Sequence, residues 1–490
     1  MTECCISKKI RILAHILFDM FYKKLIFVSV LLLNISIEAF STTITLSGSD
    51  RNYANTEIAF YKTSDPIVKS DVLIAKTIAD SAGQFTLSIE LSQTTYIYCY
   101  QGIYKYFLYA EPLHIYNLIL PPKTILSDAD RQNPFFEYAP VHLVFYNMND
   151  TDLNFSIRSF DDAWVPYFNR FAQNIYSRTS RNMIDTTLAS LNKPYIGNNN
   201  AFFNTYKDYK NGLLRHLAYQ QKSKAVWKEF FYNKPVLIDN PGYAELFNQV
   251  FDKYFFYFSL DPKGKALADI INKQKSLHAL KTILNTDSIL YNDSLKELVI
   301  LKNLHDEFYK ANYSRAAMLV ILDTLIVTSL SAKYKSIGLE IREKVTKLIA
   351  GFEPPAFELT DINGKKYSLH DFKGKYLYLC FCSCNSYSCL KEFDALQAVA
   401  NTHKEKLNVV TIFVGDEILD IKNFITKSKY NFLFLSSIQQ PEIVKKYDIR
   451  AYPTYYFIGR DGKLINSPAP SPSEGFEVKW YEHLKNIKDL

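Results

Sequence analysis

The chain has 490 residues, of which 48% are hydrophobic, and it carries a net charge of +7 and seven cysteines. This length suggests roughly three domains at the usual ~100–200 residues each. The positive charge is spread thinly, with no basic block and no acidic tail, which argues against nucleic acid as a partner. The sequence therefore indicates a multidomain globular protein.

The N-terminus has the pattern of an export signal. Two lysines precede an apolar run over residues 25–37, and small residues follow it. This pattern is typical of a cleaved signal peptide, and the run is shorter than the ~20 residues of a membrane span. We expect residues 1–41 to be a signal peptide, with residues 1–19 as a mis-assigned extension before a natural start at Met20. The mature protein is then expected in the periplasm or cell envelope, without a stable membrane span. An uncleaved anchor or a buried first strand is the alternative.

The cysteines are unevenly distributed. Cys4 and Cys5 leave with the signal peptide, and five remain: Cys99, Cys380, Cys382, Cys384 and Cys389. Because five is odd, at least one thiol stays free or pairs between chains. Four of the five lie within ten residues, so they cannot staple a large protein together. In an exported protein, such a local group of thiols indicates redox chemistry or its relic.

Residues 42–150 have the pattern of an all-β sandwich. Gln84–Leu91 alternates polar and apolar residues after a turn signal, and aromatic segments between glycines and prolines follow. The expected strands are 56–61, 84–91, 95–100, 104–109 and 114–120. Short strands at regular spacing favour a small antiparallel sandwich.

Residues 151–351 have the period of α-helices, with apolar residues at i, i+3 and i+4. The expected helices are 243–258, 266–283, 294–313 and 316–349. Gly351 followed by paired prolines at 354 and 355 marks a domain boundary. We therefore expect an α-helical middle domain that ends at residue 351.

Residues 352–490 alternate between strand and helix patterns. An apolar strand over residues 376–382 precedes a helix over 390–402, with Leu390, Phe393, Leu396 and Val399 on one face. Alternating elements of this kind predict an open α/β sheet.

Three ordered motifs in this last part resemble the TlpA/ResA-like branch of the thioredoxin superfamily. They are Ala356–Lys375 as the leading hairpin, Leu379–Glu392 as the active-site segment, and Tyr447–Thr454 followed by Phe457–Leu464 as a cis-proline loop and its hairpin. The resemblance implies a thioredoxin-like fold and thiol-disulfide oxidoreductase activity without a cofactor. It also implies partners that are protein thiols, disulfides or extended peptide segments. Tyr452 and Pro453 are the substrate-binding residues that the resemblance implies.

The active-site segment departs from the family pattern. Asn385-Ser386 stands where the family has Trp-Cys, so the site reads Ser-x-x-Cys. A hydroxyl does not ionise near neutral pH and cannot form a disulfide, although Ser386 is well suited to cap a helix. Cys389 matches the family's second cysteine. Glu392 matches a carboxylate that helps proton movement.

Several interpretations of the thiols remain open. Cys380, Cys382 and Cys384 alternate along the expected strand and should share one face, where neighbours two apart are poorly placed for a disulfide. Cys384 could meet Cys389 across the loop as a redox pair. A metal site made of Cys382, Cys384 and Cys389 lacks a clear fourth ligand, so no metal is expected. Buried structural thiols are the remaining alternative.

Two functions follow from the sequence. The first is a thiol-disulfide oxidoreductase with a degenerate site, in which Cys389, Cys384, Ser386 and Glu392 are the catalytic candidates. The second is a non-catalytic binding protein of the cell envelope that keeps only the thioredoxin-like fold.

Overall fold

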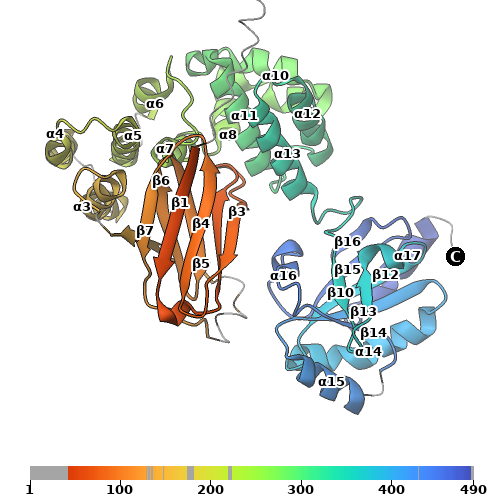
Figure 1. The fold of residues 1–490 in the computed structure, drawn as a ribbon. Helices are drawn as coiled ribbons and strands as arrows, with labels where there is room; N and C mark the ends of the chain where they lie inside the picture. Colours follow the sequence, from red (N-terminus) through yellow and green to blue (C-terminus); the bar gives the residue numbers. More distant parts are fainter. Residues whose placement is uncertain are drawn as a thin grey trace, which may run out of the picture.

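The computed structural model describes residues 42–127, 130, 133, 136–146, 148–173, 181–218, 223–428 and 430–486. The expected signal peptide over residues 1–41, with Cys4 and Cys5, lies outside these residues. Along the chain, a strand-rich region precedes a helical region and then a C-terminal region of alternating strands and helices. In Figure 1 the helical region lies at the top, with the other two regions beneath it. Within the described part of the chain, no helix is long and apolar enough to cross a lipid bilayer.

The strand-rich region contains two sheets. The first has the order β4-β1-β7-β9 and consists of β1 (Thr42–Ser49), β4 (Gln84–Leu91), β7 (Ile115–Ile119) and β9 (Val144–Phe145). The second has the order β3-β2-β5-β6-β8 and consists of β2 (Glu57–Thr63), β3 (Asp71–Ile78), β5 (Thr95–Gln101), β6 (Tyr104–Ala110) and β8 (Ala139–His142). Every second side chain of β4 is buried, and buried residues of both sheets belong to one hydrophobic cluster. The strands expected over residues 56–120 are confirmed.

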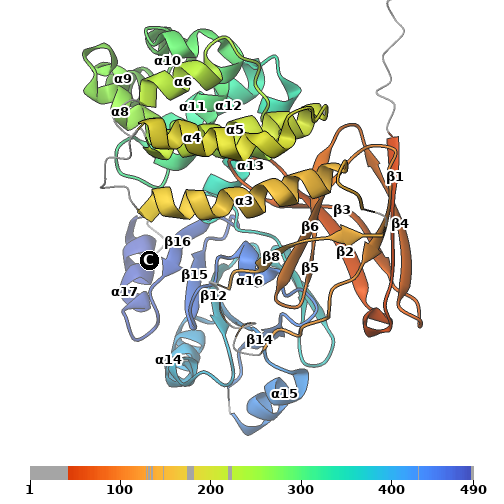
Figure 2. The same cartoon turned by 90° about the vertical axis from the view of Figure 1, so that its left-hand side faces the viewer.

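The helical region packs around one large apolar cluster. Its helices are α3 (Leu153–Gln173), α4 (Arg181–Asn192), α5 (Ala201–Ala218), α6 (Ser223–Phe231), α7 (Pro241–Val250), α8 (Tyr254–Leu260), α9 (Leu267–Asp269), α10 (Leu277–Leu284), α11 (Asp293–Glu307), α12 (Arg315–Thr328) and α13 (Ala332–Thr346). Figure 2 shows α3, α4 and α5 lying alongside one another.

Three of the long helices expected here are each divided in the structure. Residues 266–283 are divided between α9 and α10, because Lys275 adopts a left-handed conformation with φ of 51° and the side chain of Ser276 starts α10. Residues 243–258 form α7 and α8, because Lys253 between them adopts a left-handed conformation with φ of 50°. Residues 316–349 are divided between α12 and α13, because the side chain of Ser331 accepts the N–H of Tyr334 and starts a new helix. The prediction of single helices is wrong at all three places, since a break of this kind leaves the apolar pattern intact.

The C-terminal region is a seven-stranded sheet with the order β11-β10-β14-β13-β12-β15-β16. The strands are β10 (Glu358–Thr360), β11 (Lys366–Ser368), β12 (Tyr376–Cys382), β13 (Leu407–Phe413), β14 (Leu433–Ser436), β15 (Thr454–Ile458) and β16 (Leu464–Ala469). The helices are α14 (Tyr387–His403), α15 (Ile418–Lys427), α16 (Ile443–Lys446) and α17 (Phe476–Asn486). α14, α15 and α17 contribute to the core on one face, and α16 to the core on the other. The expected α/β sheet is confirmed.

β12 is an interior strand of this sheet, between β13 and β15, and all of its residues are buried. It is parallel to β13 and antiparallel to β15. Cys380 and Cys382 belong to the core beneath α14, whereas Leu379 and Phe381 belong to the opposite core. A strand buried on both faces has a fixed register, because a slip of one residue would exchange its two faces.

α14 packs on this core through a slightly different face than the sequence predicts. Cys389, Phe393, Leu396 and Val399 are its buried residues, whereas Leu390 is 41% exposed. The prediction of Leu390 on the buried face is wrong, because residues 389, 393 and 396 already complete the helical spacing. Helix packing therefore directs Cys389 toward β12.

Polar contacts join the C-terminal region to the other two regions. Lys445 lies 2.9 Å from the carboxylate of Asp71, and the N–H of Gly351 donates to the carbonyl of Leu464 at 2.7 Å. Burial alone would raise the pKa of Asp71, but hydrogen bonds from Lys445 and Tyr98 lower it below its usual value. Figures 1 and 2 both show α16, which carries Lys445, on the side that faces the strand-rich region.

Replacing Phe393 by alanine should loosen α14 from the sheet. Phe393 is fully buried, with its ring 6.2 Å from that of Phe413 and 5.1 Å from that of Phe424. Truncating a buried phenylalanine costs about 3–5 kcal/mol. We therefore expect the opening free energy of β12 and β13, measured by amide hydrogen exchange, to fall by about that amount. Leu390→Ala, on the exposed side of the same helix, should lower it by less than about 1 kcal/mol. Equal effects of the two changes would contradict this packing.

Candidate functional site

The turn over residues 383–386 connects β12 to α14 and positions the site. Ser386 precedes the helix with extended backbone angles, and its carbonyl accepts the N–H of Leu390 at 3.0 Å. Its side chain makes no capping hydrogen bond, because the hydroxyl hydrogen-bonds the sulfur of Cys389 instead. The prediction that the Ser386 side chain caps the helix is therefore wrong, and its hydroxyl contacts the Cys389 sulfur instead.

Three buried sulfurs lie together beneath this turn. Cys380, Cys382 and Cys389 are each fully buried, and we call them the thiol cluster. The sulfurs of Cys380 and Cys382 are 3.1 Å apart, and the thiol of Cys382 hydrogen-bonds the sulfur of Cys389. The N–H of Ser383 also donates to Cys389, at 3.4 Å. Cys389 thus accepts hydrogen bonds from a thiol, a backbone amide and the hydroxyl of Ser386.

These donors favour the thiolate form of Cys389. The hydrogen bond from Cys382 lowers the pKa of Cys389 to about 7, against the effect of burial, and Ser383 and Ser386 add to the decrease. Burial, followed by hydrogen bonds with Cys380 and Cys389, raises the pKa of Cys382 well above its ordinary value. Within this pair, the thiolate therefore forms more readily at Cys389 than at Cys382.

Cys384 lies apart from the thiol cluster in its hydrogen bonding. β12 ends at Cys382, so Cys384 belongs to the turn and not to the strand. Its thiol hydrogen-bonds the carboxylate of Asp416, and burial together with this contact raises the pKa of Cys384 to about 12. The structure therefore directs the Cys384 thiol toward Asp416, whereas Cys382 and Ser386 contact Cys389.

Asp416 is a site residue that the sequence analysis missed. Its carboxylate accepts the hydroxyl of Ser383 at 2.8 Å, the N–H of Cys384 at 2.9 Å and the amide of Asn385 at 3.3 Å. Asp416 follows β13, which is parallel to β12. Because parallel strands end at the same edge of a sheet, a polar residue three positions after the end of β13 was the available signal.

The Tyr452–Pro453 peptide bond is cis, in agreement with the resemblance. Tyr452 lies close to the cluster: burial, followed by the charges of Asp416, Cys389 and Cys382, raises its pKa to about 12. The structure thus brings the two predicted substrate-binding residues to the edge of the thiol cluster.

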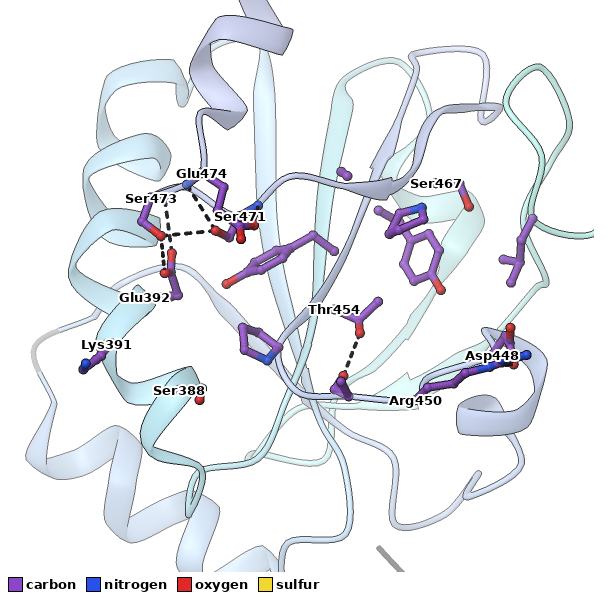
Figure 3. A pocket seen from close by; sticks show the side chains of 17 residues that line it. Ser388, Lys391, Glu392, Asp448, Arg450, Thr454, Ser467, Ser471, Ser473 and Glu474 are labelled. Carbon is purple, nitrogen blue, oxygen red and sulfur yellow. Dashed lines mark hydrogen bonds and ion pairs between the residues drawn. The ribbon is translucent and has the colours of Figure 1, made fainter. Parts of the chain in front are cut away.

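A cavity of about 840 Å³ opens between α14 and the cis-proline loop (Figure 3). Its lining comes from Leu348, from Ser388, Lys391 and Glu392 on α14, from parts of residues 448–456 that include Pro453, and from parts of residues 467–474. Cys389 is buried beneath the surface. It directly follows Ser388, which lines the cavity. The cavity therefore lies next to the thiol cluster.

Glu392 lies on the wall of this cavity, where Ser473 holds it (Figure 3). Its carboxylate accepts the N–H of Ser473 at 3.2 Å and its hydroxyl at 2.5 Å. Tyr455 also lines the cavity. Burial raises the pKa of the Tyr455 hydroxyl, and nearby Cys380, Cys382 and Glu392 add to the increase. Glu392 and the sulfurs of Cys380 and Cys382 thus lie near the same hydroxyl, that of Tyr455.

Among the residues that the structure describes, no group of three or more histidine, cysteine or acidic side chains is arranged to hold a metal ion.

The C-terminal part of this chain is similar in sequence to known proteins. Residues 350–467 match the AhpC/TSA family. A thiol-disulfide oxidoreductase ResA from Bacillus cereus is 32% identical over 175 residues, which are 35% of this chain and 94% of that protein. The chain belongs to the ResA family of thiol-disulfide oxidoreductases. A second ResA, from Bacillus thuringiensis, is 34% identical over 146 residues, which are 29% of this chain and 82% of that protein.

A crystal structure from Bacteroides vulgatus, named as a thiol-disulfide oxidoreductase, is 22% identical to this chain. The match covers 28% of this chain and 98% of that one, with a TM-score of 0.27. The C-terminal region, which carries the AhpC/TSA match, has the thioredoxin-like fold of the ResA family.

Alkylation of Cys389 in this ResA-family site should follow pH with a midpoint near 7. Because its pKa is lowered to about 7, the reactive thiolate forms as the pH rises through that value, below the ~8.5 of a free cysteine. Ser386→Ala removes one donor and should raise the midpoint by up to about 1 unit. The measurement is iodoacetamide labelling of the Cys389 peptide, followed by mass spectrometry across pH.

Ser388→Ala is the matched control, since it removes a hydroxyl from an exposed residue next to Cys389. It should leave the midpoint unchanged. An unchanged midpoint in Ser386→Ala as well would mean that the Ser386 hydroxyl does not stabilise the thiolate.

Proposed function

We propose that this chain is an exported thiol-disulfide oxidoreductase of the ResA type in which Cys389 is the attacking sulfur. The observation that carries the proposal is the set of three hydrogen bonds that Cys389 accepts beside a cavity bounded by Pro453. A thiolate is the species that attacks a disulfide. Protein thiols and disulfides in extended segments are the substrate class that this reaction requires.

The proposal includes the organisation of the whole chain. Residues 42–150 form a β-sandwich domain, residues 151–351 a helical domain and residues 352–490 the thioredoxin-like domain. The hydrophobic clusters support this division, since one joins the two N-terminal sheets and two others cover the faces of the C-terminal sheet. With residues 1–41 as a signal peptide, the mature protein is in the periplasm or cell envelope.

The site is degenerate because Ser386 occupies the position of the family's first cysteine. Its hydroxyl hydrogen-bonds Cys389, so the residue keeps the place of an attacking group without its chemistry. Thiol-disulfide exchange through the family's usual pair of cysteines therefore cannot occur at this site. What Ser386 supplies is stabilisation of the one sulfur that is left.

The cavity supports binding of an extended peptide. Ala451 and Pro453 line the cavity wall, where backbone groups beside Tyr452 can pair with such a segment. A cysteine of that segment would lie near Ser388, one residue before Cys389. Glu392, on the same wall, is placed to exchange protons with the incoming thiol.

A second candidate is a binding protein that keeps the cavity without turnover. The observation that favours it is the complete burial of Cys389, because an attacking sulfur has to reach its target. The helical and strand-rich regions would then contribute to recognition of the partner. The two candidates differ in what removal of Cys389 does: it abolishes disulfide reduction in the oxidoreductase, whereas the binding protein has no such activity to lose.

Ser386→Cys should increase disulfide reduction sharply. The change places a second thiol at the start of α14, where an exposed thiolate is favoured. We expect the rate of reduction of a short disulfide-bridged peptide by the pre-reduced full chain to rise at least ~10-fold, because the thiolate fraction and access both increase. Ser388→Cys, which adds a thiol to an exposed position of the same helix, should raise the rate far less.

Cys389→Ser separates the two candidates. The oxidoreductase requires that this variant lose peptide reduction while it still binds the peptide, as measured by fluorescence anisotropy. If the pre-reduced wild-type chain and Cys389→Ser bind equally and neither reduces the peptide, the oxidoreductase proposal fails and the binding protein is favoured.

A further inference from the structure

The thiol cluster contains more sulfur than the proposed reaction uses. Exchange at Cys389 requires a second thiol to release the bound substrate, and the family's partner position is Ser386. Three other cysteines lie within the same ten-residue segment: Cys380, Cys382 and Cys384. The hydrogen bonding of each decides which one can serve.

Cys384 is held away from this role by its partner. Its thiol hydrogen-bonds Asp416, and its N–H donates to the same carboxylate at 2.9 Å. Asp416 also accepts the hydroxyl of Ser383 at 2.8 Å. To reach Cys389, the Cys384 thiol would have to leave this carboxylate, which would then lose one of the partners that compensate its burial.

Cys380 is close to Cys382 but poorly oriented for a disulfide. The two sulfurs are 3.1 Å apart, yet both residues lie on β12 and point to the same face. Residues two apart on a strand are separated by ~6.6 Å, close to the ~6.8 Å upper limit for bridged cysteines, and their side chains run parallel. Cys380 therefore hydrogen-bonds Cys382 without being its best covalent partner.

Cys382 meets both requirements for a disulfide with Cys389: it lies close to that residue, and its side chain is suitably oriented. It is the last residue of β12, whereas Cys389 lies in the first turn of α14, so the two side chains approach from different elements. Both residues belong to the same core, and the N–H of Ser383, the residue after Cys382, donates to the Cys389 sulfur at 3.4 Å. The hydrogen bond between the Cys382 thiol and the Cys389 sulfur agrees with this placement. We propose that Cys382 is the resolving thiol, and that the oxidised protein carries a Cys382–Cys389 disulfide. This inference rests on the proposed function for the role of Cys389 as the first attacking sulfur.

The reaction balances with a substrate disulfide as the oxidant. The Cys389 thiolate attacks one substrate sulfur, forming a mixed disulfide and releasing the other sulfur as a thiolate. Cys382 then attacks the Cys389 sulfur, the bond to the substrate breaks, and the proton from Cys382 goes to the departing substrate thiolate. Two protein thiols are oxidised and one substrate disulfide is reduced to two thiols.

The surroundings of the cluster offer polar groups for the proton that moves. In the register of the sheet, Cys380 is opposite Thr411 on β13 and Tyr455 on β15. The buried hydroxyls of both residues lack hydrogen-bond partners within the described part of the chain. A buried hydroxyl without a hydrogen-bond partner is unfavourable. A hydrogen bond from a neighbouring thiol to either hydroxyl would therefore be favourable. Tyr455 also lines the cavity that holds Glu392.

Disulfide mapping of the full chain tests this pairing. The reduced protein is incubated with glutathione disulfide over a range of ratios to glutathione, trapped with acid, digested and analysed by mass spectrometry. We expect one intramolecular disulfide, between Cys382 and Cys389, while Cys380, Cys384 and Cys99 stay as thiols. A Cys384–Cys389 or Cys380–Cys382 disulfide, or a chain that stays reduced at every ratio, would overturn the proposal.

Matched variants separate the roles of the neighbouring thiols. Cys382→Ala should cause the mixed disulfide of glutathione with Cys389 to accumulate at least ~10-fold over wild type, because no thiol resolves it. Cys384→Ala and Cys380→Ala should form the Cys382–Cys389 disulfide as wild type does. If Cys382→Ala does not fold, the wild-type map alone decides. The proposed function can fail in the peptide assay while this disulfide still forms, and it can survive with a different pairing.

Discussion

The buried carboxylate of Asp416 holds the turn on which the whole site depends. A carboxylate that is only 7% exposed needs hydrogen bonds to compensate its desolvation, and it obtains them from the side chain of Ser383, the backbone of Cys384 and the side chain of Asn385. By fixing residues 383–385, it sets the direction in which α14 leaves the sheet. The same carboxylate also accepts a hydrogen bond from the thiol of Cys384, the cysteine of this turn.

With that turn fixed, two packing constraints select the sulfurs that meet. β12 is buried on both faces, so its alternation places Cys380 and Cys382 in one core. The spacing of buried residues on α14 turns Cys389 into the same core, through Phe393 and the residues one turn further on. The thiol cluster is therefore a consequence of apolar packing, and its electrostatics follow from how few polar groups reach it.

Much of this region could be predicted from the sequence because its signals are local. The strand 376–382, the helix after it and the proline loop at residue 453 each follow from short patterns. The partners of the thiols could not, because Asp416 is 32 residues from Cys384 and acts through the pairing of β12 with β13. The division of residues 316–349 was also missed, since Ser331 starts a helix without disturbing the apolar period.

Leu348 has a consequence for how the C-terminal region is isolated. It precedes the boundary marked by Gly351 and the two prolines, yet it lines the cavity beside Pro453 and packs against the core under α16. A fragment cut at residue 352 would keep the sheet, the sulfurs and the proline loop but would lack part of the cavity wall. The cavity of such a fragment would be wider and more hydrated than that of the intact chain, so binding measured on the fragment would describe a different molecule.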